Sequence, residues 1–417
     1  MLELAAIVLT LTACLAWFNE RFVHLPATIG VMVIALLLSL AIQGLAGLGL
    51  GAPAAVTRSW VEALDFDSLL MNGMLSFLLF AGALHVDVKK LKRYWFSIGL
   101  LATLGVLVST LLIGFASHWL LGAMGVPVAL PWCLVFGALI SPTDPVAVLG
   151  ILRGAGAPED MEVRIVGESL FNDGVAVVLF TLLVGAAESG ESLAGLHAIT
   201  LFAEEAGGGA LFGLVLGYGV HLLMSRVDQY QVEVLLSLAM VLGGYTLATH
   251  LHVSGPIAMV VAGLVVGNHA WTHAMSSNTR EHLNDFWELI DEILNALLFV
   301  IIGLELLALP FDWNYLLVAL PLIVLLLAVR GFVVSGPVLL ARSRFRTGSI
   351  RVLTWGGLRG GISVALALSL PAGEARDILL NVTYLIVLFS IVTQGLTIGA
   401  LVRRVVPGKA GSPEQGD

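Results

Sequence analysis

The sequence predicts an all-α, polytopic membrane protein. Hydrophobic residues make up 58% of the 417 residues and charged residues only 12%, and the mean hydropathy is +0.98. A soluble domain of this length would need a far more polar surface. Apolar runs of about 18–25 residues recur along the whole chain, and each is long enough to cross roughly 30 Å of hydrocarbon as a helix.

These runs predict about thirteen transmembrane helices in one transmembrane domain over residues 1–406, followed by a short cytoplasmic tail over 407–417. The first span opens with MLELAAIV and lacks a basic segment, which indicates a retained helix rather than a cleaved signal peptide. The predicted spans are 2–19, 25–45, 68–86, 95–121, 130–152, 161–186, 199–224, 232–252, 255–272, 289–309, 314–341, 351–371 and 377–402.

The positive charges test this count independently, because cytoplasmic loops carry an excess of Lys and Arg. Of the 20 basic residues, Arg330 and Arg359 lie inside spans, and Arg58 and Arg376 follow even-numbered spans. All others follow odd-numbered spans or lie in the tail, which predicts an outside N-terminus and a cytoplasmic C-terminus in a cell (inner) membrane. They are Arg21, Lys89, Lys90, Lys92, Arg93, Arg153, Arg164, Arg226, Arg280, Arg342, Arg344, Arg346, Arg351, Arg403, Arg404 and Lys409.

The charge and the cysteines exclude other classes of protein. The net charge is −9, and topology already explains the basic loops, so we expect no nucleic-acid partner. The two cysteines, Cys14 and Cys133, both lie within spans, so a disulfide framework is not expected.

The sixth span carries a polar patch in the stretch GESLFNDGVAVV. Glu168 and Asn172 are four residues apart, as are Ser169 and Asp173, so all four lie within about one and a half turns of helix. A buried polar cluster that joins helices would explain the serine and the asparagine. It explains two acids poorly, because an ionised group in a membrane costs a few kcal/mol or more unless it is paired or hydrated. The patch therefore favours a functional site.

The fifth span contains GALISPTDPVAVLG, in which Pro142 and Pro145 flank Thr143 and Asp144. Each proline removes a backbone donor, so we expect the helix to kink or unwind at this point. The freed carbonyls need protein or water around them, and they are hard oxygen ligands that suit an alkali cation. A purely structural kink is the alternative, but it does not explain an acid between two prolines.

The twelfth span contains TWGGLRGGISVALALSLP, in which glycines surround Arg359. Gly356, Gly357, Gly360 and Gly361 weaken the helix and allow close packing. Close packing alone would explain the glycines, but it does not account for the arginine.

The two interrupted spans occupy corresponding positions. If the seventh span, 199–224, is a linker, residues 1–186 and 232–402 form two six-helix halves of inverted topology. Spans 5 and 12 are then the fifth helix of each half, and such interrupted helices indicate a transporter site near the bilayer midplane. The chain shows no self-similarity in sequence, so this repeat follows from topology alone.

The motifs SPTDPVAVLG, GESLFNDGVAVV and TWGGLRGG, in this order and spacing, resemble the sodium/proton exchangers of the first cation:proton antiporter class, in its bacterial branch. The likeness runs from the first span to the last. It implies a homodimer with a dimerisation part and a mobile core, and the core contains two crossed, partly unwound helices that spans 5 and 12 match.

The resemblance also implies roles for the polar patch and the fifth span. Asp173 matches the aspartate that binds the cation and carries the proton, and Asn172 matches the asparagine that marks electroneutral exchange. Ser169 and Thr143 match polar ligands of the monovalent metal ion beside Asp173. Asp144 matches the acid of the unwound segment.

The basic residues inside spans also match family positions. Glu168 matches a glutamate that pairs with an arginine, and Arg330 in LLLAVRGFVV is our first choice for that partner. Arg359 matches the arginine of the glycine-rich crossing helix, where Gly357 and Gly360 flank it.

The expected activity is exchange of a monovalent cation, Na⁺ first and Li⁺ or K⁺ as alternatives, for H⁺. A cation can bind Asp173 only when its carboxylate is ionised, so cation and proton compete, and the bare charged site crosses the membrane poorly. We expect no cofactor besides the transported ions. The expected partners are these ions, the lipid bilayer and a second copy of the chain.

Two other functions remain open at this stage. A same-architecture transporter could move another solute, such as an organic anion coupled to sodium, although a patch of acids suits such cargo poorly. A membrane hydrolase would need a nucleophile and a base, which His250, His252 and Ser254 in THLHVSGP resemble superficially.

Overall fold

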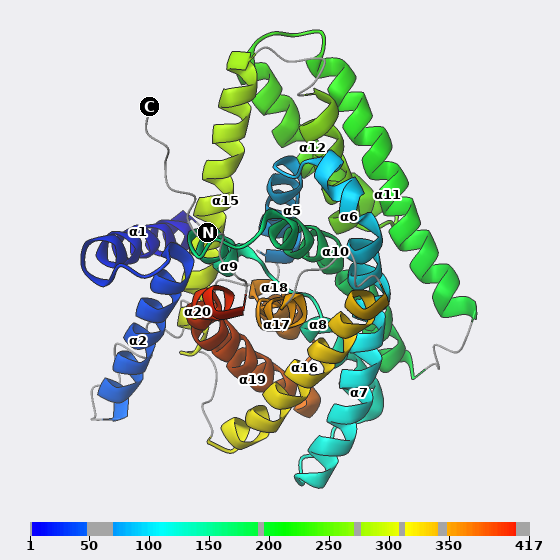
Figure 1. Ribbon diagram of the computed structural model, residues 1–417. Helices are drawn as coiled ribbons and strands as arrows, with labels where there is room; N and C mark the ends of the chain where they lie inside the picture. The colour runs from blue at the N-terminus through cyan, green and yellow to red at the C-terminus, as the bar shows by residue number, and fades with distance from the viewer. Residues whose placement is uncertain are drawn as a thin grey trace.

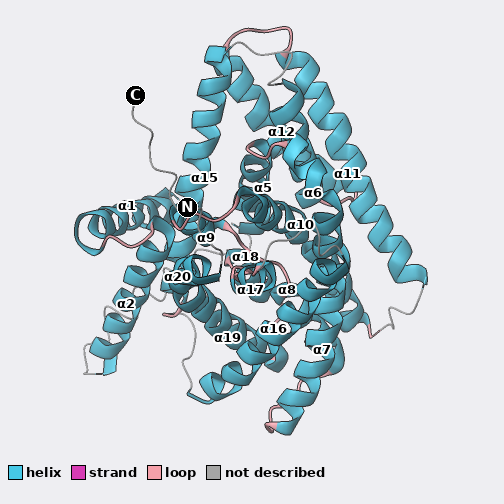
Figure 2. Cartoon of the chain, viewed as in Figure 1, coloured by secondary structure: helices cyan, strands magenta, loops and turns pink. Residues whose placement is uncertain are grey.

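A computed structural model describes residues 2–47, 70–190, 196–270, 277–307, 313–340 and 348–405. All regular structure within these ranges is helical, with no strand among them (Figure 2). The predicted tail, 407–417, and several of the loop residues used in the charge count lie outside the described residues. Those loop residues are Arg58, Arg342, Arg344, Arg346 and Lys409.

Every predicted span overlaps at least one helix of the structure. Within the part of the chain that the structure describes, five single π-helical turns extend or join these helices, so that α6, η3 and α7 run continuously. The elements are α1 (Leu2–Phe18), η1 (Asn19–Val23), α2 (Ala27–Gly47), η2 (Leu70–Met74), α5 (Leu75–Leu84), α6 (Val88–Leu100), η3 (Leu101–Gly105), α7 (Val106–Ala123), α8 (Leu130–Ile140), α9 (Val146–Gly154), α10 (Glu159–Ser189), α11 (Leu196–Met224), α12 (Tyr230–His250), α13 (Gly255–Val265), η4 (Val266–Ala270), α15 (Ser277–Glu305), α16 (Trp313–Leu340), α17 (Ser349–Trp355), α18 (Gly361–Leu368), α19 (Glu374–Phe389), η6 (Ser390–Gln394) and α20 (Gly395–Val405).

Eight helical segments of the described residues are long and apolar enough to cross a membrane, and three shorter apolar helices accompany them. Two helices begin several residues before the predicted start of their span. The predicted tenth span begins at 289, whereas α15 begins at Ser277, and the predicted fourth span begins at 95, whereas α6 begins at Val88. Hydropathy detects the apolar part of a helix, and these two helices continue beyond it as amphipathic turns.

Side-chain caps set two helix starts. The carboxylate of Asp87 accepts a hydrogen bond from the Lys89 N–H at 2.8 Å and so caps α6. The hydroxyl of Ser254 accepts from the Ile257 N–H at 3.3 Å at the start of α13, where Pro256 needs no hydrogen-bond acceptor.

Two helices are broken in the middle of the molecule. Residues 141–145 separate α8 from α9, and residues 356–360 separate α17 from α18. The prolines of the first break and the glycines of the second explain the loss of helix. The two breaks touch, because the Asp144 N–H donates to the Leu358 carbonyl at 2.9 Å. In Figure 1, α8, α17 and α18 meet at the centre of the molecule.

The helices pack in two groups around this centre. One group contains α1, α2, α5, α11, α12, α13 and α15, which contact mainly one another. The other contains α6–α10 and α16–α20. In Figure 1, α11, α12 and α15 occupy the upper part of the view, and α7, α16 and α19 the lower part. The long helix α10 lies between them and also contacts α11 and α13 of the first group.

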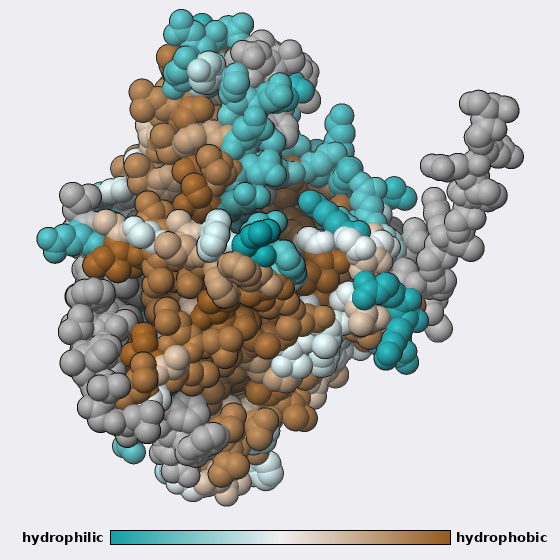
Figure 3. Space-filling view, turned by 90° about the vertical axis from the view of Figure 1, so that its left-hand side faces the viewer, coloured by the Kyte–Doolittle hydropathy of each residue, from teal (hydrophilic) through white to brown (hydrophobic). Residues whose placement is uncertain are grey.

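The outer surface is apolar, as contact with lipid requires. Trp119 on α7 and Phe332 on α16 are exposed by 73% and 68%. On the face in Figure 3, hydrophobic side chains cover most of the lower part, while hydrophilic ones gather toward the top and the right edge. Lys90, after the third predicted span, pairs with Glu159, after the fifth. The two loops therefore lie on one side, as the positive charges predicted.

Glycine allows the close approach of α7 and α8. A Cβ atom on Gly137 would lie 3.1 Å from the Thr110 Cα and closer still to its carbonyl, whereas Gly122 on α7 has open space around it. We expect Gly137→Ala to lower the stability of the detergent-solubilised protein by about 1–3 kcal/mol through overpacking. Gly122→Ala should leave the melting temperature unchanged or slightly raised. Equal melting temperatures for the two variants would contradict this packing.

Candidate ion-binding site

The polar patch of α10 is buried beside the two helix breaks. Glu168, Ser169, Asn172 and Asp173 are each at most 8% exposed, although α10 is otherwise apolar at this depth. Spacings of one and four residues direct these side chains toward different neighbours. Each of the four therefore has its own surroundings, which decide what it can do.

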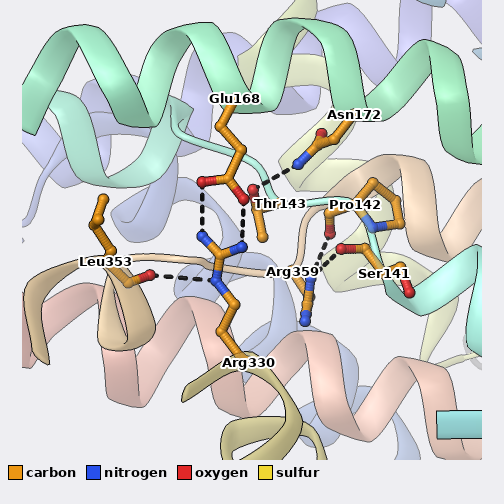
Figure 4. A network of polar contacts seen from close by, with 8 residues as sticks. All are labelled: Ser141, Pro142, Thr143, Glu168, Asn172, Arg330, Leu353 and Arg359. Atoms are coloured by element: carbon orange, nitrogen blue, oxygen red, sulfur yellow. Dashed lines mark hydrogen bonds and ion pairs between the residues drawn. The ribbon is translucent and has the colours of Figure 1, made fainter. Parts of the chain in front are cut away.

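Glu168 forms a buried ion pair with Arg330 of α16. The Arg330 Nη1 and Nη2 atoms donate to the two carboxylate oxygens, the second at 2.9 Å, and Nε donates to the Leu353 carbonyl at 3.3 Å (Figure 4). A Cβ atom on Gly357 would lie 2.7 Å from Arg330 Nε, so glycine is required there. The pair joins α10, α16 and α17, and it engages both oxygens of Glu168.

Arg359 binds backbone carbonyls of the opposite break. Its Nη1 donates to the Ser141 carbonyl at 2.5 Å and to the Pro142 carbonyl at 2.9 Å (Figure 4). Pro145 lacks the N–H that would bond the Ser141 carbonyl in a continuous helix, and the arginine takes its place. Among the described residues Arg359 forms no ion pair with a carboxylate, so carbonyl dipoles stabilise its charge.

Hydrogen bonds from η6, which follows α19, hold the loop that carries Arg359. The Arg359 N–H donates to the Ser390 hydroxyl at 2.9 Å, and this hydroxyl donates to the Gln394 side-chain carbonyl at 2.6 Å. The Gln394 amide in turn donates to the Trp355 carbonyl at 3.0 Å. This chain of hydrogen bonds satisfies backbone groups that the second break leaves without helical partners.

Asn172 and Thr143 connect α10 to the first break. The Asn172 Nδ2 donates to the Thr143 hydroxyl at 2.9 Å, while the Asn172 Oδ1 is buried without a hydrogen-bond partner among the described residues. Asp144 accepts from the Val146 N–H at 2.9 Å through Oδ1, and a Cβ atom on Gly360 would overlap its carboxylate. These contacts hold Thr143 and Asp144 next to the polar patch.

Asp173 differs from Glu168 because its carboxylate is free. It lines a cavity of about 340 Å³ together with Ser169 and Asp144. It makes no hydrogen bond or ion pair with any residue that the structure describes. A buried carboxylate without a protein partner, beside a hydroxyl and a second carboxylate, can bind a proton or a hard cation.

The cavity contains only part of the predicted site. Thr143, Asn172, Glu168, Arg330 and Arg359 do not line it. Two larger hollows, of about 830 and 870 Å³, contain none of the predicted site residues, so size does not identify the site.

Three polar residues of α15 that were not predicted from the sequence, Glu288, Asp291 and Asn295, also line the cavity. Asp291 and Asn295 belong to the predicted tenth span, 289–309, and Asp291 lies close to its start, where an acid normally contacts water or headgroups. Their spacing of four residues was a signal that they share one helix face.

The hydrolase alternative has no support in the geometry. The Ser254 hydroxyl caps α13, and no hydrogen bond joins it to His250 or His252 within the described residues. A nucleophile and its base would need such a contact.

Comparison with known proteins decides the family. The family model described as "Sodium/hydrogen exchanger, transmembrane" matches residues 7–404. The chain belongs to the sodium/hydrogen exchanger family. The family resemblance of the three motifs is therefore confirmed, and the chain is a multi-pass membrane protein of a transporter family.

Named relatives and a solved structure agree with this assignment. The chain is 53% identical to the Na(+)/H(+) antiporter NhaP of Pseudomonas aeruginosa over 98% of both chains. It is 39% identical to the Na(+)/H(+) antiporter NhaH of Halobacillus aidingensis over 73% of this chain and 75% of that protein. The sodium proton antiporter MjNhaP1 of Methanocaldococcus jannaschii has the same fold, with a TM-score of 0.74 at 20% identity over 97% and 98% of the chains.

The ion pair predicts a large loss of stability on truncation. We expect Glu168→Ala to lower the free energy of unfolding by about 3–5 kcal/mol, because Arg330 is left buried and unpaired. The control Glu159→Ala removes a glutamate of the same helix from an exposed pair with Lys90, and it should leave the free energy of unfolding nearly unchanged because solvent screens that pair. Melting temperatures of the purified variants give the measurement. Similar losses for both would contradict the pairing as a stabilising contact.

Proposed function

We propose that this chain exchanges a monovalent cation, Na⁺ first and Li⁺ or K⁺ as alternatives, for H⁺, with Asp173 as the shared carrier. The observation that carries the proposal is the free, buried carboxylate of Asp173 in the cavity. Membership of the sodium/hydrogen exchanger family and the antiporter names of the relatives support the choice of cargo.

Competition for one carboxylate couples the two flows. A cation binds only the ionised form of Asp173, and a proton neutralises the same oxygens. An empty, charged site carries a desolvation cost of a few kcal/mol or more when it leaves its aqueous cavity, so the loaded forms change orientation more easily. Each cycle therefore moves one monovalent cation in one direction and one proton in the other.

Ser169 and Asp144 complete the proposed cation shell. Both line the cavity with Asp173, and their hydroxyl and carboxylate oxygens are hard ligands. Thr143 supports this shell, with its hydroxyl held by the Asn172 amide. Water fills the remaining positions.

Electroneutral exchange is consistent with the different roles of Glu168 and Asp173, the two acids of the polar patch on α10. Glu168 is engaged by Arg330 through both oxygens, so it is not free to carry a proton. Asn172 is uncharged at the position beside Asp173. One exchanging carboxylate then gives one proton for one monovalent cation.

The proposed architecture has thirteen spans in two inverted halves, 1–186 and 232–402, with 199–224 as the linker. The group with α10 acts as the mobile core, and the group with α15 as the dimerisation part of a homodimer. The N-terminus is outside a cell (inner) membrane and the C-terminus is cytoplasmic. His85 and Arg153 line the cavity next to the basic loops, so we place its opening on the cytoplasmic side.

An organic anion is a weaker candidate cargo. Asp144, Asp173, Glu288 and Asp291 all line the cavity, and four carboxylates would repel an anionic substrate. The charge of the cavity therefore favours a cation.

The test uses purified protein in proteoliposomes with an imposed pH gradient, to which Na⁺, Li⁺ and K⁺ are added in turn. We expect Asp173→Asn to reduce cation-dependent proton movement to the rate of protein-free liposomes, because the amide cannot exchange a proton for a cation. Asp377→Asn, an exposed aspartate of α19, is the matched control and should keep the wild-type rate. Exchange retained in Asp173→Asn would remove Asp173 from the carrier role.

A further inference from the structure

One face of α15 forms the cavity wall across from α10. Glu288, Asp291, Asn295 and Leu298 follow one another at spacings of three, four and three residues, which places them on one side of a helix. All four line the cavity that contains Asp173. The acidic face of α15 and the polar patch of α10 therefore share one aqueous space.

Burial increases along this face toward the site. Glu288 is exposed, Asp291 is half-buried, and Asn295 is only 3% exposed. Asp173, on the other wall, is 8% exposed. A cation that enters at Glu288 thus meets oxygen atoms at increasing depth before it meets Asp173.

The charges that face the cavity have an excess of negative sign. The carboxylates are Glu288, Asp291, Asp144 and Asp173, and Asp144 is an electrostatic neighbour of both Asp173 and Asp291. Arg153 also lines the cavity, but its guanidinium pairs with Glu162 at 3.3 Å. His85 has Nδ1 at 2.7 Å from the Ala81 carbonyl. A cleft of one sign with apolar walls concentrates counter-ions.

Asn295 adds an acceptor that is not an acid. Its Nδ2 donates to the Asp291 carbonyl at 2.9 Å, and its Oδ1 receives no hydrogen bond from any described residue. Asn295 lines the cavity, and this oxygen is not enclosed by protein, so a ligand in the cavity can reach it. Together with the Asp291 carboxylate it offers the oxygen donors that an alkali cation prefers.

We propose that Asp291 and Asn295 form a second, transient binding subsite, through which the monovalent cation passes between solvent and Asp173. The subsite rests on the proposed function, because it assumes that Asp173 exchanges cations. It extends that function, because it assigns cation ligands to α15, which lies outside the three sequence motifs and the crossed helices.

The subsite acts on one side of the membrane only. Asp291 belongs to the helix group of α1, α2 and α5, whereas Asp173 belongs to the group of α8 and α16. When Asp173 faces the opposite side, it leaves the cavity that Asp291 lines. Loss of Asp291 therefore weakens cation capture at the face to which this cavity opens, and not at the other face.

The experiment measures Na⁺-dependent proton movement in everted and right-side-out membrane vesicles. We expect Asp291→Asn to raise the apparent KM for Na⁺ about tenfold at the cavity face, which is the lower end of the range for charge-focused binding. The apparent KM at the opposite face and the maximal rate should stay within about twofold of wild type, a sidedness that a purely structural role would not produce.

Three further variants complete the test. Asp285→Asn removes the same charge from an exposed position of α15 outside the cavity and should behave as wild type. Asn295→Leu keeps Asp291 but removes the amide oxygen, and it should raise the KM at the cavity face. Asp291→Glu keeps the carboxylate, so its apparent KM for Na⁺ at the cavity face should stay within about twofold of wild type.

Two results would overturn the subsite while leaving Asp173 as the carrier. One is an Asp291→Asn variant that matches Asp285→Asn, and the other is an equal rise of KM at both faces. Wild-type protein without any cation-dependent proton movement would instead overturn the proposed function, and the subsite with it.

Discussion

The bidentate pair between Glu168 and Arg330 is the contact on which the centre of the molecule depends. Two broken helices place backbone carbonyls and carboxylates at a depth where water is scarce, and each of these groups needs a partner. Arg330 ties α10 and α16 to the Leu353 carbonyl of α17, and Arg359 ties the second break to the carbonyls of the first. Without the guanidinium groups of Arg330 and Arg359, the crossing would contain unsatisfied polar groups in an apolar interior.

The same contact separates the roles of two acids that lie little more than one turn apart. Glu168 has both oxygens occupied and serves as a fixed counter-charge. Asp173 has no such partner among the described residues and faces the cavity. The chain thus uses a permanent ion pair to hold the helices and leaves the second carboxylate free for ligands. Neighbours, rather than depth of burial, make the difference.

The sequence predicted the helices, both breaks and the polar patch, because apolar runs, prolines and glycines act locally. It also suggested Arg330 as the partner of Glu168, although through the family resemblance and not through spacing. The carbonyl ligands of Arg359 and the cavity face of α15 could not be predicted, since both depend on how distant segments pack. Asp291 looked like a residue near a span end, and only the tertiary fold places it beside the cavity of Asp173.

Gly360 leaves so little space that the carboxylate of Asp144 lies directly against its backbone. In the same segment, the Leu358 carbonyl accepts a hydrogen bond from the Asp144 N–H, and the Arg359 side chain donates to the Ser141 carbonyl. Sliding one crossed helix past the other would rupture all of these contacts at once. The crossing is thus a rigid joint that ties α8 and α9 to α17 and α18, so its oxygen ligands keep a fixed arrangement relative to one another.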